Sequence, residues 1–143
     1  EKRYVNIKPG MNKVIEKIDK RLLLAEVSLH KSLVLSASVF VDDHVVSQNY
    51  LYFKKPKELA LEDPGISYEV NKSPEGFEIK ISTKQLAKNV FISFENCDSR
   101  DIQLSDNFFD MLPGSTVVIS AKTMEKPDEI IKNMRVRTLF HVH

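Results

Sequence analysis

The chain has 143 residues, with 21 Lys and Arg against 20 Asp and Glu and a hydrophobic fraction of 42%. This length allows one domain, or one small domain with part of another, and the composition suits a globular core. A net charge of +1 gives no electrostatic reason to expect nucleic acid or an anionic membrane as a partner. The longest apolar run, residues 22–25, is too short to span a bilayer.

Cys97 is the single cysteine, which excludes an internal disulfide and does not fit a small disulfide-stapled extracellular module. A lone thiol fits a cytosolic or periplasmic protein, or one piece of a secreted one. The sequence opens Glu1-Lys2-Arg3-Tyr4, with neither an initiator Met nor a signal peptide, which indicates a piece of a longer protein. Periplasmic, secreted and lysosomal locations all stay open for that parent.

The first part of the chain gives mixed signals. Val14, Ile18 and Leu22 recur at spacing four, which indicates a helix, although residues 14–18 would equally suit a short strand. From Leu33 to Val41 apolar residues recur at period two, the pattern of a half-buried strand.

An aromatic cluster follows at residues 48–53. On a strand, Tyr50 and Tyr52 share one face, while the apolar side chains between and after them take the other. We expect core packing with the hydroxyls at the rim, in preference to a platform for a ligand such as a sugar.

After residue 62 the strand signals become regular. Apolar and polar residues alternate in four further segments, at residues 77–81, 90–94, 117–121 and 134–142. In the last of these, Arg135 and Arg137 face away from the apolar row, where they keep the strand solvated and guard an edge. Between the last two segments, Lys126 to Lys132 has Pro and acids early and Lys late, which predicts a single helical turn.

Pro and Gly mark the turns between these segments. Three turns, at residues 8–10, 63–65 and 112–114, place Pro second and Gly third, the order of a type II turn with positive φ at Gly. Ser73 to Gly76 puts Gly fourth, which suits type I. Short strands with turn signals roughly every 8–12 residues predict a sandwich or barrel.

The turn at residues 62–65 is the best domain boundary. After it come roughly 80 residues with six candidate strands, enough for one small sandwich. The stretch before it, with about four strands, is thin for an independent sandwich. We therefore expect an all-β protein: a complete Ig-like β-sandwich at residues 64–143, preceded by a second small or partial Ig-like domain at residues 1–63, cut short at its N-terminus.

Acid pairs are the first candidates for catalysis, since glycosidases use two carboxyl groups about 5–9.5 Å apart. The candidates are Asp42 with Asp43, Asp98 with Asp101, and Asp106 with Asp110. All sit in turns or strand ends beside Ser, Asn or Gly, and none is flanked by the apolar burial that raises a carboxyl pKa. We interpret them as turn-forming, solvated carboxylates.

Nucleophile and metal motifs are equally weak. Cys97 has no basic neighbour closer than Arg100, and the chain has no Gly-x-Ser-x-Gly elbow. His141 and His143 would share one side of the predicted last strand, a spacing that can chelate a metal, but they lack a third ligand nearby. His30 and His44 are isolated. The sequence therefore predicts no catalytic, cofactor-binding or metal-binding residue.

Residues 105–114, Ser-Asp-Asn-Phe-Phe-Asp-Met-Leu-Pro-Gly, resemble a run in the C-terminal Ig-like domain of glycoside hydrolase family 2 β-mannosidases. In that family a Ser-Asp-Asn-aromatic-Phe-Asp-Leu-Leu-Pro-Gly run leads into a strand. The strands predicted at residues 88–94 and 115–121 fit its neighbours, and residues 39–61 resemble the end of the family's penultimate Ig-like domain. The resemblance covers roughly Leu33 to Phe140.

The same run has a mechanical interpretation. Ser105, Asp106 and Asn107 can bond local backbone and turn the chain inward. Either Phe108 or Phe109 then anchors the core, and the Pro-Gly turn reverses the chain. The motif is thus a folding signature and says nothing direct about sugar chemistry.

The resemblance implies a role within a larger enzyme. Such enzymes carry two catalytic glutamates on a TIM barrel of about 250 residues, which this chain is too short to hold. This fragment would then be a non-catalytic accessory region, with the barrel and other domains of the parent as partners. The parent would release terminal β-linked mannose with retention. Alternatives are the same region of an exo-β-glucosaminidase or β-galactosidase, or a stand-alone carbohydrate-binding or adhesive Ig-like module with an oligosaccharide partner.

Overall fold

The computed structural model describes residues 2–19, 21, 30–95, 102–123 and 127–142. It divides into two compact units, Glu1–Ala60 and Leu61–His143. Each unit has its own pattern of strands and burial.

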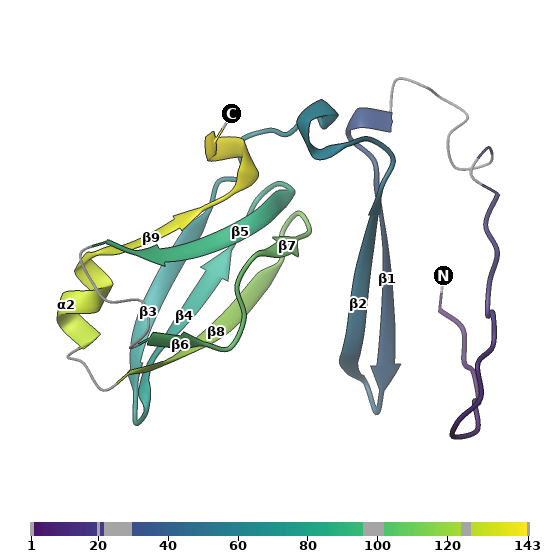
Figure 1. The fold of residues 1–143 in the computed structure, drawn as a ribbon, viewed down its shortest axis with the longest axis horizontal. Coiled ribbons are helices and arrows are strands. Elements are labelled where there is room, and N and C mark those ends of the chain that lie inside the picture. The colour runs from purple at the N-terminus through teal and green to yellow at the C-terminus, as the bar shows by residue number, and fades with distance from the viewer. Residues whose placement is uncertain (1, 20, 22–29, 96–101, 124–126, 143) are drawn as a thin grey trace. The chain divides into compact units, whose positions relative to one another are not determined.

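The first unit contains an antiparallel hairpin of β1 (Val34–Val41) and β2 (His44–Tyr52), followed by a 3-10 turn, η2 (Pro56–Glu58) (Figure 1). Asp42 and Asp43 form the two-residue loop between the strands, with φ of 48° and 62°. Positive φ at both loop residues is the signature of a type I′ turn, whose twist matches that of the paired strands.

The hairpin is poorly buried. Val39 and Leu51 are 56% and 54% exposed, and no described residue of this unit is fully buried. The expected core packing of the aromatic cluster is therefore wrong for Leu51, while Tyr50 and Tyr52 are half-buried. A two-stranded hairpin has too little apolar contact to bury either face.

The expected count of about four strands in this unit stays a prediction, because the described part of residues 1–60 holds two strands and residues 22–29 are not described. The expected helix or short strand that begins near Val14 is wrong. Residues 11–19 form neither helix nor strand, and Leu22 lies outside the described residues. Apolar spacing alone does not fix a helix when the segment has no neighbouring surface to bury against.

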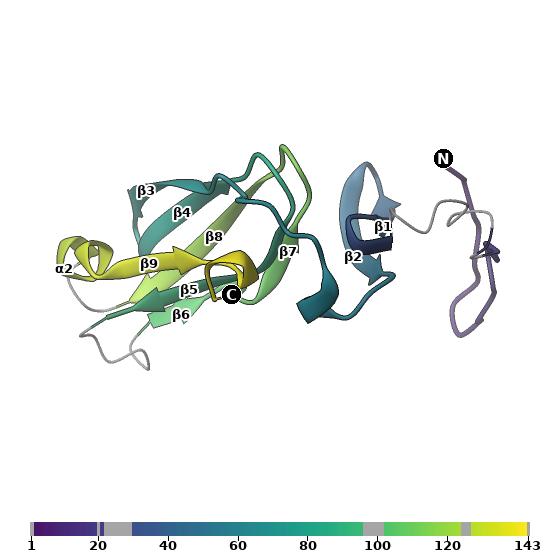
Figure 2. The same ribbon diagram turned by 90° about the horizontal axis from the view of Figure 1, so that it is seen from above.

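The second unit is built from two antiparallel sheets. One has the order β3-β4-β8-β6, from β3 (Ser67–Ser73), β4 (Gly76–Ser82), β8 (Thr116–Thr123) and β6 (Ile102–Leu104). The other has the order β7-β5-β9, from β7 (Phe109–Met111), β5 (Ala87–Phe94) and β9 (Met134–Arg137). Figure 2 shows β5 and β9 in one layer and β3 and β4 in the other.

One hydrophobic core lies between the sheets. Phe77 of β4 and Phe94 of β5 meet edge to face across it, with ring centroids 6.3 Å apart. Its buried members come from both sheets and from the helical turn before β9: Phe77, Ile79, Ile81, Ala87, Val90, Ile92, Ile102, Met111, Ile119, Ala121, Ile130 and Met134. Sheets of four and three strands around one core match the Ig-type sandwich. The all-β, Ig-like expectation is confirmed.

The turns predicted at residues 8–10, 73–76 and 112–114 are present, whereas residues 63–65 form no turn closed by a backbone hydrogen bond, and the Gly65 N–H donates to Asp63 Oδ1 at 2.9 Å. Gly10, Gly65 and Gly114 have the positive φ that the turn pattern requires. Gly76 follows the loop between β3 and β4, where a Cβ atom would overlap the carbonyl oxygen of Ala121 on β8. Only glycine therefore lets β4 approach β8 at this point.

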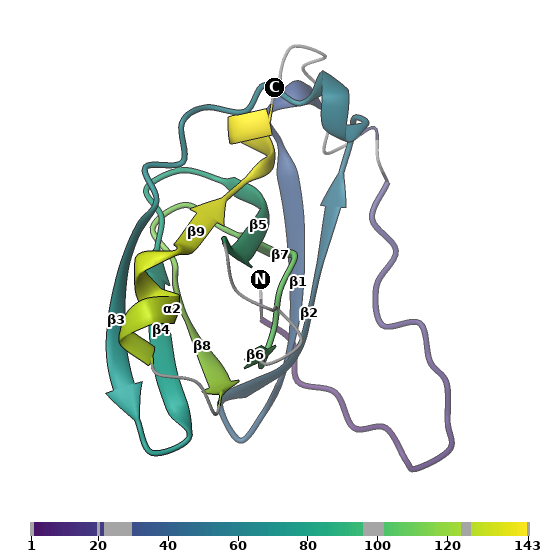
Figure 3. The ribbon, with the colours of Figure 1, turned by 60° about the vertical axis from the view of Figure 1, so that its left-hand side comes forward.

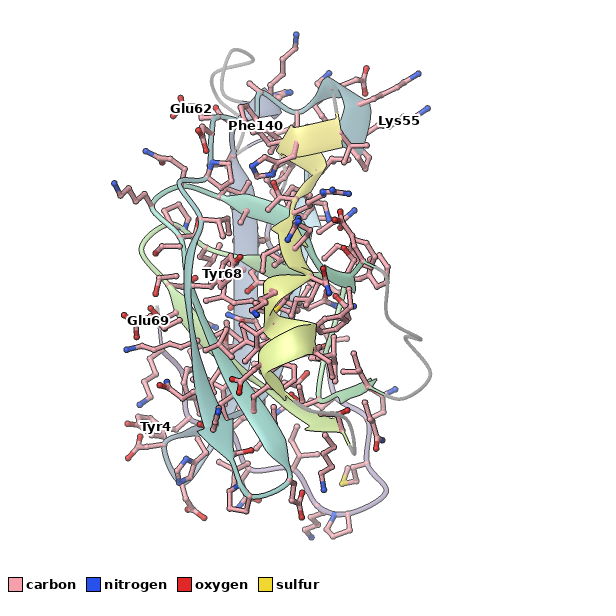
Figure 4. The ribbon with its side chains drawn as sticks, turned by 90° about the vertical axis from the view of Figure 1, so that its left-hand side faces the viewer. Tyr4, Lys55, Glu62, Tyr68, Glu69 and Phe140 are labelled. Atoms are coloured by element: carbon pink, nitrogen blue, oxygen red, sulfur yellow. The ribbon has the colours of Figure 1, made fainter. Side chains whose placement is uncertain are left out.

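The edge strand β3 is polar on most of its length. Tyr68 and Glu69, labelled in Figure 4, are both exposed, and Val70 is its half-buried contact with the core. A solvated, polar edge resists pairing with another chain.

The end of the chain departs from the predicted strand. β9 stops at Arg137, and η4 (Leu139–Val142) is a 3-10 turn. Thr138 is buried between them, and its N–H donates to Nδ1 of His141 at 3.1 Å. This bond closes a turn that a continuing strand could not form.

The helical turn predicted before β9 is present as α2 (Pro127–Lys132), shown in Figure 3 between β8 and β9. Lys72 of β3 donates to Asp128 of α2 at 3.0 Å. The helix thus covers one end of the sandwich and contributes Ile130 to the core.

Candidate functional site

The structure describes four of the six candidate acids. Asp42 and Asp43 are exposed in the hairpin loop, and Asp98 and Asp101 lie outside the described residues. Asp106 is exposed and accepts the N–H of Asn107 at 2.7 Å. Each of these described carboxylates shapes a turn, as expected.

Asp110 contradicts the interpretation as a solvated carboxylate. Its side chain is 10% exposed and forms an ion pair with the ammonium of Lys88, itself 14% exposed, at 2.9 Å. Asp110 also accepts the N–H of Asn89 at 2.8 Å. Both of these partners belong to β5, the strand that pairs with β7.

Asp19 is an exposed carboxyl whose pKa is lowered. The Arg21 side chain donates to it at 3.0 Å, and the Arg21 N–H adds a bond of 2.9 Å. Both stabilise the charged form, whereas a general acid working near neutral pH needs a raised pKa.

Among the histidine and cysteine candidates, the structure describes His30, His44 and His141. His141 lies in η4 and not on a strand, with Nδ1 bonded to Thr138, while His143, Cys97 and Arg100 lie outside the described residues. The part of the chain that the structure describes holds no group of three or more His, Cys, Asp or Glu placed to bind a metal. It also holds no helix of the length and apolarity needed to cross a membrane.

The motif at residues 105–110 instead joins the two sheets. Ser105 exchanges two bonds with Ser120 of β8: its N–H donates to the Ser120 carbonyl at 2.8 Å, and its Oγ accepts the Ser120 N–H at 3.0 Å. Two residues later, Asn107 bonds to Ile92 of β5 in the other sheet, through Oδ1 at 2.9 Å and Nδ2 at 3.0 Å. The chain crosses from one sheet to the other within this run.

Phe108 and Phe109, which follow this crossing, point in different directions. Phe109 packs against the core, which settles the alternative that the sequence left open. Phe108 has φ of 62° and is 67% exposed. Its ring stacks on Phe91, with centroids 4.6 Å and planes 22° apart.

A β-bulge lies beside this pair. Lys88 and Asn89 of β5 stand opposite the single residue Asp110 of β7, because Ala87 pairs with Met111 and Val90 with Phe109. Asn89 has φ of 51°, the left-handed conformation that often carries a bulge. The Asp110 carboxylate satisfies the Asn89 N–H and the Lys88 ammonium together.

A cluster of charged residues lies where β5 pairs with β9. The Glu95 carboxylate, just after β5, forms ion pairs with Arg135 and Arg137 of β9, each at 3.2 Å. β9 is an edge strand of its sheet, so the two arginines occupy the position predicted for them.

Sequence reasoning missed the exposed Phe91–Phe108 pair and the Lys88–Asp110 ion pair. A signal existed for the first, because adjacent residues of an extended chain point to opposite faces, so one of Phe108 and Phe109 had to face out. The ion pair joins residues 22 positions apart, and no local pattern links them.

These features define the second unit as an Ig-fold domain whose polar motif serves the connection between sheets. The Ig_mannosidase family model, which describes an Ig-fold domain, matches residues 61–142. The chain belongs to this family of Ig-like domains associated with mannosidase-type enzymes. No curated protein matched the chain.

Proposed function

We propose that this chain is the non-catalytic C-terminal accessory region of a glycoside hydrolase family 2 β-mannosidase. The family match over residues 61–142 is the observation that carries the proposal. The β-mannosidase motif at residues 105–114 supports it.

The contacts of that motif support a structural role. Ser105, Asn107 and Asp110 each direct their polar atoms to backbone or to a paired lysine. Polar groups that bond to neighbouring strands in this way hold those strands in register. The hydrolysis of the sugar would then be carried out by the TIM barrel of the parent enzyme.

The parent enzyme would hydrolyse terminal β-mannosides with retention, through two glutamates of its barrel. Sequencing the gene upstream of the codon for Glu1 should reveal a barrel of about 250 residues with two glutamates at strand ends. The expressed parent should then cleave p-nitrophenyl β-mannoside and release the β-anomer first, as read by proton NMR.

The 143-residue chain alone should not cleave this substrate. Activity of the chain that disappears in Asp106→Asn would contradict the non-catalytic role. Cleavage of the β-glucosaminide or β-galactoside by the parent, without the β-mannoside, would replace the proposed substrate by that of another family 2 enzyme.

A further inference from the structure

His141 bonds to both backbone groups of Thr138. Thr138 is 2% exposed and lies between the end of β9 and the start of η4. Its carbonyl accepts the His141 N–H at 3.0 Å, and its own N–H donates to Nδ1 of the His141 ring at 3.1 Å. The turn η4 is therefore closed by a reciprocal pair of bonds between a buried residue and an exposed histidine.

The second of these bonds fixes the position of the proton on the neutral ring. A backbone N–H can only donate, so Nδ1 must offer a lone pair and the ring proton must be on Nε2. The Thr138 hydroxyl also lies 3.0 Å from Nδ1. A ring with both nitrogens protonated could still donate to the oxygen of this hydroxyl, but the Thr138 N–H would lose its acceptor.

The charged groups on the elements next to η4 are in ion pairs of their own. β5 packs against η4, and β9 precedes it. The charged side chains of these two strands pair as follows: Lys88 with Asp110, and both Arg135 and Arg137 with Glu95. Glu62, which Figure 4 labels at the same end of the unit as Phe140, forms no ion pair with His141 among the described residues. The neighbouring ring of Phe140 meets His141 edge to face, with centroids 5.6 Å apart, and carries no charge.

We propose that His141 is a pH-sensitive switch: the turn η4 is closed while Nδ1 carries no proton, and it opens when the ring becomes a cation. Histidine is the side chain that ordinarily changes its charge between pH 5 and 8. Protonation would leave the buried N–H of Thr138 without an acceptor, and opening of the turn lets water replace it. Leu139 and Phe140, both half-buried, would become exposed together with it. The stabilisation is thus present at neutral pH and lost as the pH falls, whatever enzyme the unit belongs to.

Amide hydrogen exchange of the 143-residue chain, followed by NMR, tests the switch. Protection factors correct for the intrinsic pH dependence of exchange, and that of the Thr138 amide should fall at least about tenfold between about pH 7.5 and about pH 5. The amide of Ile79, in the core strand β4, is the control for global unfolding. Nitrogen-15 shifts of the His141 ring should place the proton on Nε2 at the higher pH.

Two variants separate the role of the ring nitrogen from that of its charge. His141→Asn places a carboxamide oxygen near the position of Nδ1, so it should protect the Thr138 amide equally at both pH values. His141→Leu has no acceptor and should leave this amide poorly protected at both. Undiminished protection of Thr138 in the wild-type chain while the His141 ring titrates would overturn the switch. A ring proton on Nδ1 at the higher pH would do the same, as would an equal loss of protection in His141→Asn, which would assign the pH dependence to another group.

Discussion

The backbone of Ile92 is bonded on one side by the side chain of Asn107. The Ile92 N–H donates to Oδ1 at 2.9 Å, and its carbonyl accepts Nδ2 at 3.0 Å. A carboxamide places an acceptor and a donor side by side, as a backbone residue of a paired strand does. The Asn107 side chain thus pairs with β5 as one more strand residue would, just before β7 begins at Phe109.

Asn107→Ala should remove this rung and destabilise the chain by about 2–3 kcal/mol, because both polar groups of Ile92 lose their partner. Urea denaturation measures the change. Asn107→Asp keeps the acceptor and loses the donor, so it should fall between wild type and Asn107→Ala. Asn71→Ala on the exposed edge strand β3 is the control, with a change within about 0.5 kcal/mol. A loss of unfolding free energy in Asn107→Ala no larger than in that control would contradict the stabilising role of the Asn107–Ile92 bonds.

The two lysine–aspartate pairs of the second unit, Lys88–Asp110 and Lys72–Asp128, should differ in their contribution to stability. Asp110→Ala leaves the Lys88 ammonium, 14% exposed, without its main partner and should cost about 3 kcal/mol. Asp128→Ala breaks a pair with Lys72 in which both side chains are more than 65% exposed, and should cost less than about 1 kcal/mol. The double change Lys88→Met with Asp110→Leu should recover part of the loss. Similar costs at both sites, by chemical denaturation, would contradict the burial argument.

Gly76 and Gly114 should respond differently to alanine. At Gly76 the new Cβ would overlap the backbone of β8, so Gly76→Ala should cost at least about 2 kcal/mol. At Gly114, with φ of 72° and open space around it, only the conformational penalty remains, about 1 kcal/mol. Thermal unfolding of the two variants compares them, and the prediction fails if Gly114→Ala is the more harmful.

Amide hydrogen exchange should separate the two units. Amides paired within β1 and β2 should exchange through local opening, since no described residue of that unit is fully buried. Amides at the centre of β4 and β5, beside Phe77 and Ile92, should exchange only on global unfolding. Protection of the hairpin equal to that of β4, measured by mass spectrometry, would contradict this expectation.

The sandwich was predictable from the sequence where one strand face is buried. β4, with Phe77, Ile79 and Ile81 pointing inward, carries the period-two pattern in full. β3 shows no such pattern, because it lies at the edge and half-buries only Val70 among its apolar side chains. The sequence predicts too long a last strand, because Phe140 continues the alternation of apolar and polar residues. In the structure, the bond from Thr138 to His141 turns the chain before Phe140.

The motif was found in the sequence, but its geometry was not. Ser105 and Asn107 read as turn residues, and the identity of their partners depends on which strands pass on either side. Ser120 and Ile92 are each 15 positions away from them, in opposite directions along the chain. The ion pair of Asp110 and the outward direction of Phe108 follow from that crossing, so they too required the structure.

The crossing at residues 105–107 has a mechanical consequence. Ser105 is fastened to β8 and Asn107 to β5, with only Asp106 between them. One sheet therefore cannot shear past the other without breaking one of the two fastenings. Under a pulling force, the domain should yield as one body in a single rupture, and Asn107→Ala should lower the force at which it does.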